Sequence, residues 1–471
     1  MMKKYLYKLF LLVLVVAVAP ACTDDFAELN TNPNAPTDVP STNILVSAIT
    51  NSISRIHGAD MNMTYGGLWA QHYAKIQYID EDYYSYRTAN MDAHWTGLYV
   101  GPLLDLQTII EKEDTPANMK AAAMTLKAYI FSVITDMWGD IPYFSALKGG
   151  EAIQPVYDSQ EDIYKDLVVQ LEQAAGMFDE GGDDLGAGDV LYGGDISKWI
   201  KFANSLRMRL LNRMSGVNPA AKATLESMIN SGASIISSND DNASLVYVGD
   251  VSYSNPLYAN KHYSGRNDHA SSKTMVDMLL SLNDPRIAVY AEPTKNDPSV
   301  YNGQPNGSVQ PGDFGTISLI GEAFRDDPEG PSHVITYAEM LFIKAEVMND
   351  KQAYLDGIAA AMEMYDLTPS ADYLSAAGAA FDTDYIQAIA NQRWIALFGN
   401  GCEAFSEYRR TGYPSTIQEV PGSVYPGKGV PYRFAYATTE FTTNGSNLNT
   451  AISSQGIDDS GLFGAKMWWA K

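Results

Sequence analysis

Hydrophobic residues recur at every third or fourth position over several long stretches of this 471-residue chain. This spacing places them on one face of an α-helix. In one stretch the apolar face follows a capping serine, Ser159, and consists of Ile163, Leu167, Leu171, Ala174 and Phe178. In another it follows Asp195 or Ser197 and consists of Trp199, Phe202, Leu206 and Leu210. Further helices are expected at about 119–138, 219–232, 271–281, 334–349, 351–366 and 383–398. The best strand candidate is short, Leu245–Val248, so the sequence predicts a mostly α-helical fold with few short strands.

The expected helices come in adjacent pairs with small residues at their contact faces. This pattern is typical of an α-solenoid built from helix–turn–helix units, although no strict 34-residue repeat is visible. Four long segments, at about 59–97, 238–270, 290–333 and 410–465, are instead rich in Gly, Pro, Asn, Asp and Tyr. Long segments without regular structure are often functional. We therefore expect a single domain over 42–471, with a helical scaffold that carries extended loops.

The N-terminus is typical of a bacterial lipoprotein precursor. A basic start with Lys3, Lys4 and Lys8 is followed by the apolar run Leu9–Val18 and by Ala19-Pro20-Ala21-Cys22. The apolar run is too short for a membrane span, and it indicates a signal peptide at 1–21. A small residue before a lone cysteine favours lipid attachment at Cys22, and several acyl chains suffice for stable anchoring. A plain cleaved signal peptide with an incidental Cys22 is the alternative.

The segment after Cys22 is expected to be a linker over 22–41, acidic at Asp24-Asp25 and rich in Pro and Asn from Asn30 onward. The acidic pair behind the lipid resembles the surface-export signal of bacterial lipoproteins, and this resemblance implies the outer face of the outer membrane; a solvated acidic tether is the alternative. Removing the signal peptide removes three lysines and changes the formal net charge from −24 to −24 − 3 = −27. So acidic a chain is repelled by nucleic acid, which we exclude as a partner.

Two loops combine aromatic and polar side chains, the mixture that a sugar receptor needs for C–H faces and hydroxyl groups. Tyrosine is abundant, with 30 residues against 15 phenylalanines. In the first loop the candidate ligand-binding residues are Tyr83, Tyr84, Tyr86, Arg87 and Trp95. In the second loop they are Tyr258, His262, Tyr263, Arg266, Asn267 and Asp268. The alternatives are aromatic side chains that seal the first loop against the helices, and a solvated second loop.

Signals for catalysis or metal binding are weak. The chain lacks HExxH, GxSxG, P-loop and GxGxxG motifs, and we predict that it is not an enzyme. A surface glycoside hydrolase, which needs only two suitably spaced carboxylates, is the enzymatic rival, and a purely structural surface protein is a third possibility. No cofactor is expected; the acidic segment Asp179–Gly186 could bind Ca²⁺ but lacks EF-hand spacing. Cys402 has no disulfide partner and is expected to be a small buried side chain.

Four sequence blocks, in order, resemble the signature segments of the SusD/RagB family. They are Thr135–Tyr143 with its Trp-Gly-Asp-Ile-Pro-Tyr ending, Tyr192–Leu210, Ile335–Glu346, and Gln392–Gly399 running on to Glu407–Pro414. The C-terminal Met467-Trp468-Trp469 also resembles the family's ending. Within these blocks, we expect core packing for Trp138, Trp199, Phe202 and Trp394. The charges in the same apolar helices are costly to bury unpaired, so we expect inter-helix salt bridges for Arg207, Arg209, Arg393, Glu339 and Glu346.

The resemblance implies a tetratricopeptide-like scaffold of helix pairs with a loop-rich ligand face. It also implies a partner, a SusC-like TonB-dependent outer-membrane transporter, over which the protein would sit as a hinged lid. The implied function is capture of nutrients at the cell surface, usually oligosaccharides, and their delivery to that transporter. Peptide or glycopeptide capture by the same machinery stays open. Ligand residues lie outside the shared blocks, so the resemblance does not identify them.

Overall fold

Helices that follow one another along the chain also pack side by side. The computed structural model describes residues 39–308 and 312–470, and Ser41–Lys471 form one compact unit. The expected signal peptide, Cys22 and nearly all of the linker lie outside the described residues. The structure is mostly helical with few short strands, which confirms the fold class expected from the periodicity.

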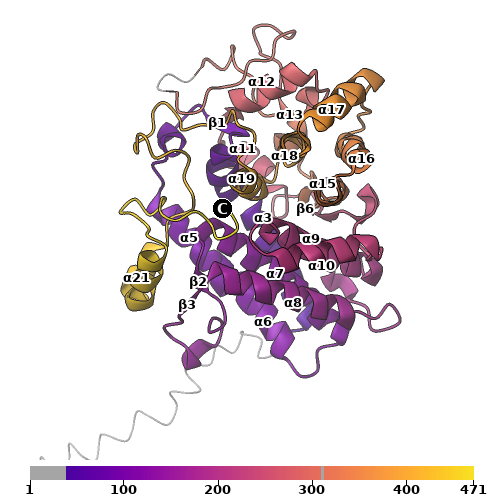
Figure 1. Cartoon of the computed structure of the whole chain (residues 1–471). Helices are drawn as coiled ribbons and strands as arrows, with labels where there is room; N and C mark the ends of the chain where they lie inside the picture. The colour runs from indigo at the N-terminus through magenta and orange to yellow at the C-terminus, as the bar shows by residue number, and fades with distance from the viewer. Residues whose placement is uncertain (1–38, 309–311, 471) are drawn as a thin grey trace, which may run out of the picture. The chain divides into compact units, whose positions relative to one another are not determined.

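The scaffold is a series of helix pairs (Figure 1). Helix α7 packs on α8, α8 on α9 and α9 on α10; further along, α15 packs on α16 and α17 on α18. Their bounds are α7 Ala117–Trp138, α8 Gln160–Met177, α9 Ile196–Met214, α10 Pro219–Asn230, α15 Tyr337–Met348, α16 Lys351–Glu363, α17 Ala371–Thr383 and α18 Tyr385–Ala396. Gly357 of α16 lets Phe342 of α15 approach closely, because a Cβ there would lie 2.9 Å from the Phe342 ring. A small residue thus sits at a helix contact, as expected.

Two predicted helix starts are confirmed by their caps. The Ser159 side chain accepts a hydrogen bond from the Asp162 backbone N–H, and the Asp195 side chain accepts one from Lys198. Both satisfy donors that the first helical turn leaves free. Helix α3 (Ser41–Ile56) and helix α17 were not predicted. Helix α17 buries Tyr373, Ala377, Gly378 and Phe381, so half of its buried residues are small and its apolar signal in the sequence is weak.

Within residues 39–308 and 312–470, the strands form three small antiparallel sheets of two strands each, and two of these sheets join segments far apart in sequence. The pairs are β1 Tyr73–Lys75 with β5 His269–Ser271, β2 Ile141–Pro142 with β3 Tyr157–Asp158, and β4 Ala243–Leu245 with β6 Ser332–Ile335. The predicted strand Leu245–Val248 is wrong apart from Leu245. Leu245 pairs with Ser332, and the next partner along β6 would be Pro331, which has no N–H to donate.

The prediction that the four long segments lack regular structure is wrong in part. They contain η1 Ala59–Gly66, α4 Gly67–Trp69, η2 Ile79–Tyr83, α5 Thr88–Leu98, η6 Asn239–Asp241, α11 Pro256–His262, α14 Glu322–Arg325, α20 Thr438–Thr443 and α21 Gly445–Ser454. The remaining helices of the unit include η3 Tyr99–Leu103, α6 Leu104–Glu111, η4 Gly149–Glu151, η5 Gly186–Gly188, α12 Lys273–Leu282, α13 Ile287–Tyr290 and α19 Gly401–Thr411. Short Gly- and Asn-rich helices of this kind have low intrinsic propensity, and tertiary packing decides their formation.

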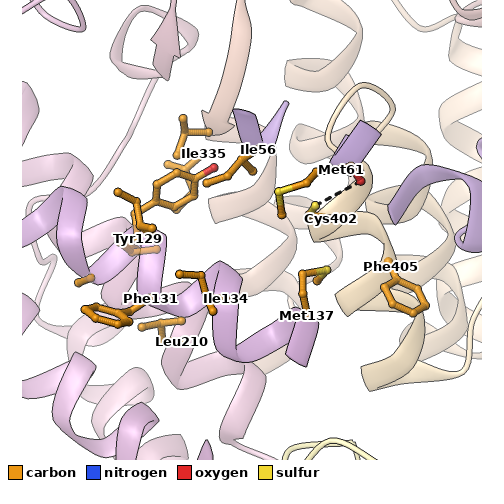
Figure 2. Close-up of a cluster of buried hydrophobic side chains, with 14 of the residues drawn as sticks. Ile56, Met61, Tyr129, Phe131, Ile134, Met137, Leu210, Ile335, Cys402 and Phe405 are labelled. Atoms are coloured by element: carbon orange, nitrogen blue, oxygen red, sulfur yellow. Dashed lines mark hydrogen bonds between the residues drawn. The ribbon is translucent and has the colours of Figure 1, made fainter. Parts of the chain in front are cut away.

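The hydrophobic core includes the aromatic residues that the sequence placed there. Trp138, Trp199, Phe202 and Trp394 are fully buried, which confirms the expected packing. Figure 2 shows Cys402 among Met61, Met137 and Phe405, with its thiol 3.7 Å from the Met61 carbonyl oxygen. Burial raises the pKa of the Cys402 thiol to about 12. The thiol is therefore protonated and inert, and the prediction of a small buried side chain is confirmed.

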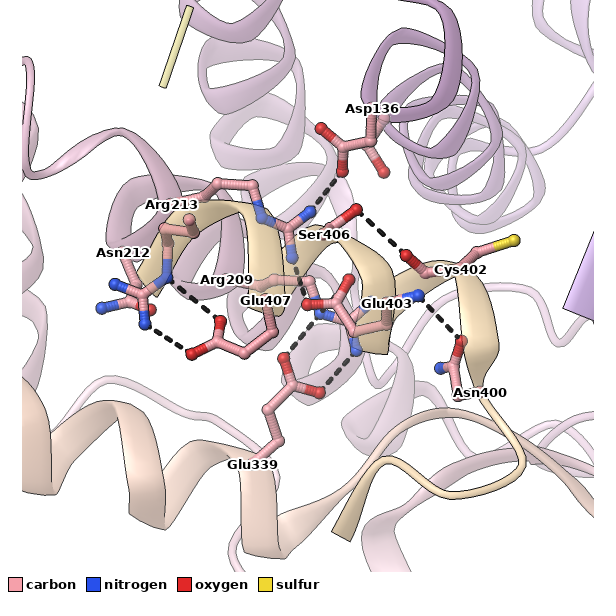
Figure 3. Close-up of polar contacts among 12 residues, drawn as sticks. Asp136, Arg209, Asn212, Arg213, Glu339, Asn400, Cys402, Glu403, Ser406 and Glu407 are labelled. Carbon is pink, nitrogen blue, oxygen red and sulfur yellow. Dashed lines mark hydrogen bonds and ion pairs between the residues drawn. The ribbon is translucent and has the colours of Figure 1, made fainter. Parts of the chain in front are cut away.

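A buried network of ion pairs ties α7, α9, α15, α18 and α19 together (Figure 3). Glu339 lies 2.5 Å from Arg209 and 3.0 Å from Arg393, and Arg213 pairs with both Asp136 and Glu403. Burial raises the pKa of Glu339, but the two arginines outweigh it and hold that pKa below its ordinary value.

Two further ion pairs contain Arg207 and Glu346, the remaining residues for which the sequence predicted inter-helix salt bridges. Arg207 lies 2.8 Å from Glu172, and Arg410 lies 2.6 Å from Glu346. Each joins two different helices. All five charged residues expected in inter-helix salt bridges are therefore found in them. A charge buried without such a partner would be strongly destabilising.

Candidate functional site

The β1–β5 ladder brings the two candidate loops together. Tyr73 pairs with Ser271 and Lys75 with His269. The backbone N–H of Ile76 extends the contact by donating to the Asp268 carbonyl oxygen at 2.8 Å. The first loop leaves the end of β1 and the second loop enters the start of β5. Residues about 190 positions apart in sequence therefore emerge side by side at one end of this small sheet.

Tyr78 and Arg266 meet across this junction. The Arg266 guanidinium lies over the Tyr78 ring, 4.5 Å from its centroid, and also pairs with the Asp268 carboxylate at 2.6 Å. The Tyr78 side chain is 57% exposed, and its backbone is in the left-handed region at φ 49°. Such a conformation is costly for a residue other than glycine and is often kept at functional sites. Tyr78 thus presents an exposed ring that Arg266 holds in place.

Helix α11 presents a second group of rings. Asn255 caps this helix by accepting hydrogen bonds from the N–H groups of Leu257 and Tyr258. The His262 ring stacks on Tyr258 one helical turn away, with centroids 4.3 Å apart, and Tyr263 meets Tyr258 edge to face at 5.5 Å. The Tyr263 hydroxyl lies 3.1 Å from Ser254 Oγ. Tyr263 is nevertheless 46% exposed.

A charged group borders these rings. Asp326, at the end of α14, accepts hydrogen bonds from Lys261 Nζ and His262 Nε2, both at 2.6 Å. Partial burial raises the pKa of Asp326, but these two donors outweigh it and hold that pKa below its ordinary value. Asp326 is therefore an ionised acceptor that orients both partners.

We define the aromatic surface by its exposed or half-buried members, Tyr78, Tyr253, Tyr258, His262, Tyr263 and Arg266. Four of them were on the list of candidate residues, and Tyr78 and Tyr253 lie in the same two loops. Lys261 and Asp326 border it. Asp326 was missed because it comes from a third loop, 290–333, and no local pattern linked that loop to α11.

Three of the candidate residues, Tyr84, Trp95 and Asp268, have buried side chains. Tyr84 is 2% exposed, and its hydroxyl accepts a hydrogen bond from the Val420 N–H at 3.2 Å. Trp95 is 5% exposed and packs against Trp138 and other rings at one wall of a separate groove of about 290 Å³. The buried Asp268 carboxylate pairs with the Arg266 guanidinium at 2.6 Å and so holds it in place. The alternative in which loop aromatics seal against the helices holds for Tyr84 and Trp95.

Other candidates in the first loop face its interior or its own acidic residues. The half-buried Tyr83 donates from its hydroxyl to the Ser308 carbonyl oxygen at 3.0 Å. Tyr86 is also half-buried and packs against the core. Arg87 pairs with Glu81 at 2.5 Å. In the second loop, the Asn267 side chain is half-buried. The second loop, which Gly265 turns at φ 65°, supplies most of the exposed site.

Neither a metal cluster nor a membrane-spanning helix stands out in the described ranges. In residues 39–308 and 312–470, no group of three His, Cys, Asp or Glu side chains is arranged to hold a metal ion. Within the acidic segment, Asp179 and Asp184 accept hydrogen bonds from Gly181 and Gly186, which closes local turns. Over the same ranges, every helix is too short or too polar to cross a bilayer.

Comparisons with known proteins agree with this fold. Residues 33–437 match the model of the SusD-like family, described as starch-binding and associating with the outer membrane. Among curated proteins, none matches the chain.

Several solved structures are similar over nearly their full length. A SusD homologue from Bacteroides uniformis is 26% identical with a TM-score of 0.78, and the match covers 91% of this chain and 99% of that one. A protein described as chitin-binding is also 26% identical with a TM-score of 0.78, over 92% of this chain and 100% of that one. A chitin-binding SusD homologue from Flavobacterium johnsoniae shares the fold at 24% identity and a TM-score of 0.79, over 91% and 98%. Because the family model matches most of its length, this chain belongs to the SusD-like family.

Proposed function

We propose that this protein is a cell-surface lipoprotein that captures oligosaccharides on its aromatic surface and delivers them to a SusC-like TonB-dependent transporter. The observation that carries the proposal is the grouping of exposed tyrosine rings with the ion-paired Arg266 and His262. Sugars offer apolar C–H faces and hydroxyl groups, and this surface offers the complement of both. The family's description as starch-binding, and the chitin-binding protein at 26% identity, support the ligand class.

Anchoring and partnership rest on the sequence and on the family. Lys3, Lys4, Lys8 and the apolar run before Cys22 support export and lipid attachment, and the family's description supports association with the outer membrane. The transporter partner is implied by the resemblance to the SusD/RagB family. A receptor tethered by one lipidated residue stays next to such a transporter, so a captured ligand has a short path inward.

Two carboxylates, Asp326 and Asp268, pair with the cations of the aromatic surface and its border, and this pairing suits binding better than hydrolysis. A glycoside hydrolase needs one carboxylic acid whose pKa is raised, so that it can protonate the leaving oxygen. The pKa of Asp326 is instead lowered by Lys261 and His262, and Asp268 is ion-paired with Arg266. We therefore propose that the ligand is released intact.

The test is calorimetric titration of the mature protein with starch and chitin fragments and with short peptides, followed by product analysis of every mixture that releases heat. The proposal expects saturable binding of at least one oligosaccharide, and recovery of that oligosaccharide at its original length. Shortened products would show that the protein is a hydrolase. Binding of peptides alone would assign it to peptide capture.

A further inference from the structure

A cavity with both apolar and polar lining residues lies beside the aromatic surface. Its volume is about 380 Å³, within the range of small-molecule sites. Leu257 of α11 and Phe324 of α14 line it, whereas Tyr258 belongs to the aromatic surface and Asp326 borders that surface. These two short helices thus separate the hollow from that surface. The opposite wall comes from β6 and from the turn that precedes α19.

Asparagine side chains hold the walls of this cavity in place. Asn62 donates to the Gly399 carbonyl oxygen at 3.0 Å, and Asn400 donates to that of His333 at 3.2 Å. Asn255 donates to the Gly330 carbonyl oxygen at 2.8 Å. These bonds join segments that are far apart in sequence. The cavity is therefore preformed, which lowers the ordering cost of binding.

His333 offers an uncommitted polar group at this cavity. Its Nδ1 lies 2.7 Å from Ser244 Oγ, and its Nε2 has no hydrogen-bond partner among residues 39–308 and 312–470. Burial lowers the pKa of His333 to about 4, so the ring is neutral near pH 7. A neutral imidazole nitrogen can donate or accept a hydrogen bond according to its tautomer. The His333 side chain is half-buried, so its Nε2 can hydrogen-bond to a ligand that enters the cavity.

The other groups at the cavity carry no uncompensated positive charge. Burial also lowers the pKa of His57, to about 3. The Glu339 carboxylate at the cavity edge is paired with Arg209 and Arg393. Among the described residues that line the cavity, none carries a free positive charge that could pair with an anionic ligand. The acidic residues of this described lining are Asp327, which is exposed, and Glu339, which is already paired.

Aromatic rings form the apolar part of the lining. Phe324 packs against Phe398 with centroids 4.9 Å apart and against Tyr365 at 5.9 Å, and all three line the cavity. Such a wall suits the C–H face of a saturated ring. We propose that this cavity is a second ligand site, separate from the aromatic surface, for one neutral polyhydroxylated ring of monosaccharide size that hydrogen-bonds to His333 Nε2.

The test is titration of the mature protein, in a detergent that contains no sugar, with glucose, N-acetylglucosamine and xylose. Glucosamine and glucuronate serve as charged analogues of similar size. At least one neutral sugar should bind, and the charged analogues should bind at least 10-fold more weakly. His333→Phe removes the ring nitrogens at similar volume and should weaken the neutral sugar at least 10-fold. Ala323→Leu, at an exposed position of the cavity lining, should weaken it by filling space.

Phe441→Ala is the control, because Phe441 is an exposed ring on α20 that lies outside the cavity lining and outside the aromatic surface. It should leave monosaccharide affinity unchanged, and thermal melting should show that all three variants are folded. If His333→Phe does not fold, the Ala323→Leu variant provides the test. Absence of binding by every neutral sugar, unchanged affinity in a folded cavity variant, or loss of affinity in Phe441→Ala would overturn the proposal. Oligosaccharide capture by the aromatic surface is tested separately by the oligosaccharide titrations.

Discussion

Arg266 bridges a ring and a carboxylate that come from different loops. It lies over Tyr78 and pairs with Asp268, so it fixes the orientation of an exposed tyrosine. The sequence placed Arg266 and five neighbours in a candidate loop, but it gave no sign of the contact with Tyr78. That contact depends on the β1–β5 pairing between residues far apart in the chain, which local periodicity does not predict.

A double-mutant cycle tests this pair. Tyr78→Ala and Arg266→Ala should each weaken oligosaccharide binding about 10-fold. The loss of affinity in the double variant should be smaller than the product of the two single losses. The reason is that each single substitution already removes the contact between Tyr78 and Arg266. Titration calorimetry measures all four affinities. Phe441→Ala, an exposed ring on α20, is the control and should bind like the unmodified protein. Strictly multiplicative losses would contradict the coupling.

Asp82 gives a prediction for the pH dependence of stability. Burial raises its pKa to about 6, although hydrogen bonds from Asn306, Gly307 and Lys75 oppose the shift. The unfolded carboxyl ionises near pH 4. Between these values the folded form holds a proton that the unfolded form has lost, so stability falls as pH rises from 4 to 6. The full loss is about 3 kcal/mol.

Asp82→Asn should remove this part of the pH dependence. Its urea-unfolding free energy should exceed that of the unmodified protein more at pH 7 than at pH 4. The difference between the two proteins should change mainly from pH 4 to pH 6. Asp240→Asn, an exposed carboxylate, is the control and should leave the slope unchanged. A constant difference between the Asp82→Asn variant and the unmodified protein across this range would contradict the assignment.

At the scale of elements, most of the long helices could be predicted, apart from α3 and α17, and most of the short ones could not. Apolar faces and the caps Ser159 and Asp195 place α8 and α9 closely, because these signals are local. Helix η1 has no such face, and Gly66 and Gly67 lower its propensity. It forms against α19, where a Cβ on Gly401 would lie 2.2 Å from the Asn62 carbonyl oxygen. Only contacts made after folding favour that helix, so the sequence suggested a loop.

This close approach predicts a large effect of a single methyl group. Gly401→Ala should lower the free energy of unfolding by about 2–3 kcal/mol, because backbone atoms must move to accept the Cβ. Gly176→Ala is the matched control, since nothing lies within 4 Å of the added Cβ and the residue is helical. It should be neutral or stabilising by up to about 1 kcal/mol. Chemical denaturation measures both, and equal effects would contradict the packing.

For the whole molecule, the scaffold helices hold the buried ion pairs, whereas the loops hold the exposed aromatic rings. Residues Arg209, Arg393 and Glu339 join scaffold helices, and the sequence predicted their role because charges in apolar helices need partners. The aromatic surface and the cavity beside it come from loops whose partners are distant in sequence. Four of the six members of the aromatic surface could nevertheless be named from composition. The buried positions of Tyr84 and Trp95 could not, because an aromatic side chain serves equally in a core or on a surface.

The anchor is a property of the whole chain. Cys22→Ser should move the protein from the membrane fraction to the soluble fraction, because no acyl chain can then be attached. Cys402→Ala changes the other cysteine, which is buried, and should leave the protein in the membrane fraction. Quantitative blotting of both fractions measures the distribution. Retention of the Cys22→Ser protein in the membrane would contradict lipid anchoring at this residue.

The most direct measurement of the central claim is the affinity of an oligosaccharide for the double variant Tyr258→Ala/Tyr263→Ala. Both rings belong to the aromatic surface, and α11 is short and exposed enough to tolerate their loss. We predict at least 100-fold weaker binding than in the unmodified protein, with an unchanged melting temperature and no cleavage of the sugar. Phe441→Ala should bind normally. Unchanged affinity in the double variant would place the ligand elsewhere and contradict the account.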